Sequence, residues 1–144
     1  MSAPLLEVAD ALVALLNTAT LSVPVVATRK YLTVFAPETL AALETLTVTV
    51  VPVALVGSKA AREGEFVELS VAVHVQQRVD MSLPAIDVLM ALVQEIIDTV
   101  KYTTVSSLPA MSTGYENDPV FSPEDLGQMR LFTSTVVFHF RILR

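Results

Sequence analysis

Residues 66–79 read FVELSVAVHVQQRV, and this stretch decides the fold class. Apolar side chains stand at every second position from Val67 to Val75, and the positions between them carry Glu68, Ser70, Ala72, His74 and Gln76. A period of two places alternate side chains on opposite faces of a β-strand. We therefore predict a strand with one dry face, packed on a core, and one wet face.

The residues before this strand predict its hairpin partner. Residues 45–56 (TLTVTVVPVALV) are rich in Val and Thr, which favour strands. The linker Gly57–Gly64 (GSKAAREG) is polar and locally basic, and we expect it to be a flexible, exposed hairpin arm. Pro52 has no N–H for a strand ladder, which places it on a sheet edge or at a bulge.

Two longer helices flank these strands in the sequence. Residues 4–16 and 83–101 both carry apolar residues at helical spacing. Ser82 can cap the second helix, and Pro84 fits its first turn. The remaining elements are a strand at 25–35, a helical turn at 37–44, an irregular stretch at 102–129 with a helical turn near 123–129, and a final strand at 130–143.

These elements follow the order α-β-(α)-β-β-α-β, where the bracketed element is the turn at 37–44. We predict an α+β protein with a mixed, mostly antiparallel sheet and the two main helices packed on one face. A length of 144 residues fits a single domain over 1–144. Hydrophobic residues make up 53% of the chain and charged residues 17%, which indicates an ordered protein.

The charge balance restricts the kinds of partner. A formal net charge of −6 argues against a protein that wraps a phosphate backbone. It is compatible with lining a channel through which nucleic acid passes without sticking. The charge-free stretch 11–28 is about long enough to span a membrane, but Asn17, Ser22, Pro24 and three Thr favour a helix end followed by a strand. We expect a soluble protein with no membrane contact.

Residues able to carry chemistry are few and scattered. His74 and His139 lie on the wetter faces of two predicted strands, and together they would supply only half of a zinc site. Carboxylates gather at Glu116, Asp118, Glu124 and Asp125, where they would either bind calcium or form turns. The chain has no Cys, only four Gly and no GxSxG motif. We predict no catalytic residue, no metal and no cofactor.

Basic residues are more informative by their positions. Arg29 and Lys30 interrupt the strand at 25–35, while Lys59 and Arg62 lie in the predicted arm. In an acidic chain these four are candidate contacts for an acidic neighbour or for another copy of the chain. The alternative is that they keep an edge strand and a loop soluble.

Several segments, in their order along the chain, resemble the tail terminator (neck) proteins of long-tailed bacteriophages. They span nearly the whole chain, and the join between the last two is the most specific feature. They are ATRKYLTVF (27–35), PETLAALETLTVTVVP (37–52), the charged arm, VAVHVQQRVD (71–80), EIIDTV (95–100), ENDPVFSPEDL (116–126) and RLFTSTVVFHFRI (130–142).

The resemblance implies a structural subunit of the virion, assembled in the host cytoplasm, with a mixed sheet flanked by helices and no cofactor. It implies a homo-oligomeric ring, hexameric in this family, that caps the tail tube at its head-proximal end. Its partners would be the tail tube protein and a head-side neck or connector protein, with genome DNA passing through the lumen without specific binding. Two alternatives stay open: a head-side neck or head-completion protein, and a small ligand-binding or catalytic α/β domain.

Overall fold

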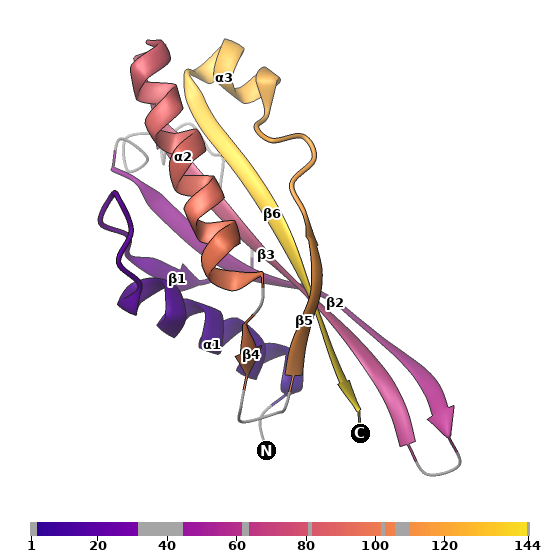
Figure 1. Cartoon of the computed structure of the whole chain (residues 1–144). Coiled ribbons are helices and arrows are strands. Elements are labelled where there is room, and N and C mark those ends of the chain that lie inside the picture. The colour runs from indigo at the N-terminus through magenta and orange to yellow at the C-terminus, as the bar shows by residue number, and fades with distance from the viewer. Residues whose placement is uncertain are drawn as a thin grey trace.

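A computed structural model describes residues 3–31, 45–61, 64–80, 82–101, 103–105 and 110–143. The described residues form three helices and six strands (Figure 1). In chain order these are α1 (Pro4–Thr18), β1 (Ala27–Arg29), β2 (Thr47–Ala61), β3 (Gly64–Arg78), α2 (Leu83–Val100), β4 (Thr104–Val105), β5 (Ala110–Glu116), α3 (Pro123–Met129) and β6 (Leu131–Leu143).

The strands form one sheet in the order β1-β2-β3-β6-β5-β4. Only β1 pairs in parallel, with β2; the other four pairings are antiparallel. β3 is the central strand, and its partners β2 and β6 follow it along almost its whole length. The prediction of an α+β fold with a mostly antiparallel sheet is confirmed.

The core lies between this sheet and the two long helices. α1 packs on β1, β2 and β3, α2 packs on β6, and the two helices also contact each other. The odd positions of β3 from Val67 to Val75 and the even positions of β6 share this face and are buried, as the alternation predicts. The largest fully buried side chains include Phe132, Phe138, Phe140, Leu12 and Leu92.

Local sequence signals set the ends of the helices. Ser82 caps α2, and its Oγ accepts a hydrogen bond from the N–H of Ala85 at 3.3 Å. Asn17, near the end of α1, binds both backbone groups of Ala27: its Oδ1 accepts from the N–H at 2.7 Å and its Nδ2 donates to the carbonyl at 3.1 Å. This amide therefore fixes where β1 begins relative to α1.

Three predictions need correction. The linker Gly57–Gly64 is not a flexible loop, because β2 continues to Ala61 and β3 begins at Gly64. The stretch 102–129 is not irregular throughout, because it contains β4 and β5 as well as the expected turn, α3. The strand expected at 25–35 is formed at Ala27–Arg29, and its last four residues lie outside the described part, as does the turn expected at 37–44.

The face of β3 that was predicted to be exposed to solvent is buried in its middle. Ala72 and Gln76 of β3 and Thr49 and Thr133 on the flanking strands are buried although they point away from α1 and α2. We call this side of the sheet the far face. Small and uncharged polar side chains can pack closely on the face of a sheet. The alternation of apolar and polar residues along one strand does not reveal this burial.

Candidate subunit interface

The β2–β3 hairpin extends the sheet past the helices and forms an arm (Figure 1). We define the arm as Val53–Ala61 with Gly64–Leu69. Cross-strand pairs continue to its tip, with Gly57 opposite Val67 and Lys59 opposite Glu65. At ~3.3 Å per residue, β2 runs roughly 30 Å from Pro52 to Ala61.

Pro52 explains why β1 stops where it does. The N–H of Lys30 donates to the carbonyl of Val50 at 3.0 Å, so even-numbered residues of β2 direct their backbone groups outward at this point. The next outward N–H would belong to Pro52, which has none. A bulge between Pro52 and Ala54 follows directly. The prediction that Pro52 lies on an edge or at a bulge is confirmed on both counts.

The far face of the arm and the adjoining ends of β5 and β6 carry an exposed apolar cluster, which we call the arm patch: Val56, Phe66, Met111 and Leu143. Strand register brings them together, because Val56, Glu68, Arg141 and Met111 form one row across four strands, and Ser58, Phe66 and Leu143 form the next. The exposed fractions are 59% for Val56, 38% for Phe66, 62% for Met111 and 65% for Leu143.

A charged pair lies in the middle of the arm patch. Arg141 Nη2 lies 2.7 Å from Glu68 Oε1, and the guanidinium also covers the ring of Phe66, with its Cζ 5.2 Å from the ring centroid. These contacts bring Phe66, Arg141 and Glu68 together on an exposed surface. An apolar cluster around a bidentate-capable cation is the composition typical of protein–protein contact sites.

The opposite face of the same strands is buried on β3 and β6. Val67, Leu69, Phe140 and Ile142 are buried on the helix side of the arm, one residue away from the exposed positions. On this side β3 and β6 are buried, but the β2 strand of the arm is not, because Leu55, the register partner of Leu69, is 51% exposed. Among the described residues, none shields the four side chains of the arm patch more than these exposed fractions indicate.

The four basic residues predicted as contacts do not gather in one place. Arg29 lies in β1, where its Nε is 3.1 Å from Asp10 Oδ1 and its guanidinium covers Tyr31. Lys30 follows β1 and is exposed, and Lys59 is exposed near the tip of the arm. Arg62 lies outside the described residues. Their role in contacts stays a prediction, and Lys59 alone of the described three lies on the arm.

The residues of the arm patch were not predicted as a site. One signal was present for Phe66, an apolar residue with the parity of Glu68 and Ser70 rather than of the core positions. Leu143 carried the same signal, because it has the parity of His139 and Arg141. Met111 had none, and it joins the patch only through the pairing of β5 with β6.

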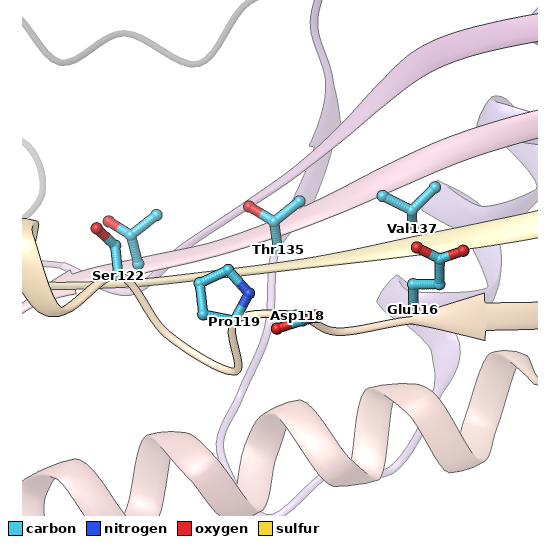
Figure 2. Close-up of a pocket in the computed structure, with 7 residues that line it drawn as sticks. Glu116, Asp118, Pro119, Ser122, Thr135 and Val137 are labelled. Atoms are coloured by element: carbon cyan, nitrogen blue, oxygen red, sulfur yellow. The ribbon is translucent and has the colours of Figure 1, made fainter.

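A second feature of the far face is a pocket of about 320 Å³ beside β6. Its lining comes from the end of β5, the bend that follows it, and three alternate residues of β6: Glu116, Asp118, Pro119, Ser122, Thr133, Thr135 and Val137. Figure 2 shows Glu116, Thr135 and Val137 side by side on one side of β6. The lining is part polar and part apolar, and both of its ionisable groups are carboxylates.

The two histidines lie on neighbouring strands but not beside each other. His74 Nδ1 is 2.8 Å from Thr135 Oγ1, and His139 Nδ1 is 2.9 Å from Ser70 Oγ. Four residues of β3 separate these pairs, roughly 13 Å along the strand, so the imidazoles cannot share one metal ion. No group of three or more His, Asp or Glu among the described residues is placed to hold a metal. Burial lowers the pKa of His74 below its ordinary value.

His139 also links a hydroxyl to a carboxylate. Its Nδ1 meets Ser70 and its Nε2 lies 3.6 Å from Glu116 Oε1. A nucleophilic serine needs backbone N–H donors aimed at a developing oxyanion. Ser70 stands in mid-strand, and the amides around it are engaged in ladders with β2 and β6. The arrangement therefore gives no positive support for a hydrolase.

The described part of the chain contains no helix long and apolar enough to cross a membrane. Comparison with known proteins adds no relative from which a role could be transferred: no protein-family model matches the chain, and no curated protein matches it.

Proposed function

We propose that this protein is a structural virion subunit that forms a closed, hexameric ring at the head-proximal end of a phage tail. The ring caps the tail tube and joins it to the head-side neck protein. The observation that supports the proposal is the arm patch, an exposed apolar surface where the ends of β5 and β6 meet a hairpin that extends past the helices. The resemblance of the ordered sequence segments to tail terminator proteins supplies the position in the virion.

A ring requires a particular kind of contact. Each subunit must present two different surfaces, so that the same contact repeats around the axis until it closes. The arm patch offers one such surface, and its place on an extension allows it to reach an adjacent subunit without moving the core. The net charge of −6 suits a lumen that DNA crosses without adhering.

The first experiment measures the mass of the purified full chain over a range of concentrations, by sedimentation or native mass spectrometry, with electron microscopy of the same samples. We expect rings of one size, six subunits if the resemblance holds. Purified tail tubes mixed with the protein should carry a cap at one end and stop growing. A chain that stays monomeric at high concentration, with no capped tubes, would refute the proposal.

The same samples separate the two alternatives. A ring that binds a head-side connector but leaves tube ends free would place the subunit on the head side of the neck. A monomer whose melting temperature rises with a small molecule would identify a ligand-binding domain. Either result would replace the proposed function.

A further inference from the structure

The arm patch is symmetric about a line that runs between β3 and β6. One row of far-face residues crosses the sheet from β2 through β3 and β6 to β5, and its members are Val56, Glu68, Arg141 and Met111. The two outer members of this row are apolar, and the two inner members carry opposite charges. The next row toward the tip places Phe66 on β3 and Leu143 on β6, one exposed apolar side chain on each side of the line.

A surface with this symmetry is complementary to a second copy of itself. Two sheets that pack face to face lie ~10 Å apart with their strands nearly aligned. A two-fold axis along the strands, between β3 and β6, would keep each residue at its own height and move it across that line. Glu68 would then face Arg141 of the second copy. Phe66 would face Leu143 in the same way, and Val56 would face Met111.

The charges select this two-fold axis over one that runs across the strands. An axis across the strands at this row would place β3 over β3, so that Glu68 faced Glu68 and Arg141 faced Arg141. Like charges placed together at an interface are strongly disfavoured. With the axis along the strands the four charges alternate in sign. Each also keeps the partner in its own chain, where Arg141 Nη2 lies 2.7 Å from Glu68 Oε1.

The size of the patch suits contact with a second copy. Its four apolar side chains are 38% to 65% exposed, which offers on the order of 400 Å² of apolar surface, about half of the ~800 Å² that each partner buries in a standard interface. In the row on the other side of the patch, nearer the body, three of the four residues are small: Ala54, Ser70 and Gly114. A Cβ placed on Gly114 would meet nothing within 4 Å, so this row leaves room for a second sheet.

We propose that the free chain forms a two-fold dimer through the far face of the arm, in which the arm patches of two copies cover each other. The pairing does not depend on the proposed ring, but it bears on how that ring forms. A patch that is covered in the dimer cannot at the same time contact a neighbour in a ring. Because a dimer needs two copies and a hexameric ring needs six, dilution favours the dimer. Free subunits would therefore be held as pairs that open when a ring closes on a tube.

Mixing two charge variants tests the pairing. Glu68→Arg gives each copy two cations at the centre of the patch, and Arg141→Glu gives each copy two anions. Each variant alone should lose the dimer, with a dissociation constant ~10- to 100-fold above that of the wild type. An equimolar mixture should form dimers with one copy of each variant, within about threefold of the wild-type constant. Only a contact between copies can be restored in this way, because the ion pair within each chain stays broken in the mixture.

The assay is sedimentation equilibrium at concentrations below those at which rings form. Native mass spectrometry identifies the mixed dimers when one variant carries ¹⁵N. The control is Asp87→Arg, which reverses an exposed charge on α2 and should leave the dimer unchanged. A melt of each variant verifies the fold, which should persist because the side chains of Arg141 and Glu68 are 49% and 52% exposed.

A cross-link gives a second measurement, in a chain that has no Cys of its own. A mixture of Val56→Cys and Met111→Cys chains should be joined by a short thiol cross-linker, because these positions face each other across the axis. Either variant alone should not be joined, because like positions lie three strands apart in the dimer, roughly 14 Å.

Failure of the charge variants to form dimers on mixing, or of the cross-linker to join the thiol variants, would overturn the pairing. A wild-type chain that passes from single copies to rings without a dimer would also overturn it, and that result would leave the proposed function standing. A chain that forms dimers but never a ring, with or without tail tubes, would overturn the proposed function and leave the pairing in place.

Discussion

Two acidic substitutions in the arm patch should prevent ring formation without unfolding the subunit. In Met111→Glu/Leu143→Glu both new carboxylates point to solvent in the single chain, because the original side chains are 62% and 65% exposed there. Exposed substitutions of this kind usually change the free energy of unfolding by less than about 0.5 kcal/mol. The folded subunit should therefore keep its circular dichroism spectrum and its melting temperature.

The cost to association follows from the area that is still exposed. Burying a whole Leu or Met side chain contributes roughly 1.5–3 kcal/mol, so the remaining three-fifths contributes about 1–2 kcal/mol for each residue. Removing both should weaken each contact by about 2–4 kcal/mol, or roughly 30- to 1,000-fold in the dissociation constant. Desolvation of the two carboxylates at a buried contact would add to that loss.

The assay is sedimentation velocity at matched concentrations, with a melt of each variant. The control is Leu83→Glu/Val88→Glu, which places the same charges on exposed apolar positions of α2, away from the arm. We expect rings in the control and single chains in the arm variant. The reasoning is refuted if the arm variant assembles within threefold of the wild type, or if its melting temperature falls as far as its association.

Three further predictions concern the fold. Phe138→Ala should lower the free energy of unfolding by about 3–5 kcal/mol in denaturant titrations, because Phe138 is fully buried between the sheet and the helices. Asn17→Ala should lower it by about 1–3 kcal/mol, because two backbone groups of Ala27 lose their partner, and proteolysis should then begin near β1. His74 has a lowered pKa in the folded chain, so the unfolded chain binds its proton first as the pH falls. The contribution of His74 to the free energy of unfolding is therefore constant above pH ~6.5 and falls below that pH. In His74→Asn, the free energy of unfolding should depend less on pH between pH 7 and pH 5.

Long elements with one clear period were predictable from the sequence. β3 and β6 bury the alternate residues that the pattern selects, and α2 begins at the cap that Ser82 indicates. In each case the local preference and the tertiary environment agree. The sequence also located Pro52 correctly, because the lack of an N–H has the same consequence in any sheet.

The strands that were not predicted share a physical cause. They are stabilised by pairing with neighbouring strands rather than by the local preference of their own residues. Ala110–Glu116 (AMSTGYE) has a weak strand pattern and contains Gly114, yet it forms β5 because the edge of β6 supplies its ladder. The linker around Lys59 is polar and flanked by glycines, yet it extends β2 because pairing with β3 resumes after the bulge at Pro52 and continues to the tip. Strand propensity depends on such context more than helix propensity does.

The candidate site was invisible for the same reason. The arm patch and the pocket each combine residues from β6 with residues that reach it only through strand register, such as Phe66 for the patch and Glu116 for the pocket. Hydrophobic periodicity assigns a side chain to a face of its own strand. It does not say which residues of other strands share that face at the same height.

The open edge of β2 bears on how copies of this chain would meet. A long unpaired edge invites indiscriminate strand addition, which natural sheets prevent with proline, bulges and lysine. Among the described residues no strand pairs with this edge beyond Val50, and the edge carries all three there, as Pro52, the bulge that follows it and Lys59. Continuation of the sheet from one copy to the next is therefore disfavoured at the edge that is longest. Contacts through the far face of the arm are more specific. The ion pair and the four apolar side chains of the arm patch fit a partner in only one register along the strands. A single register is what a closed ring needs, since any slippage along an edge would change the angle between subunits and leave the assembly open.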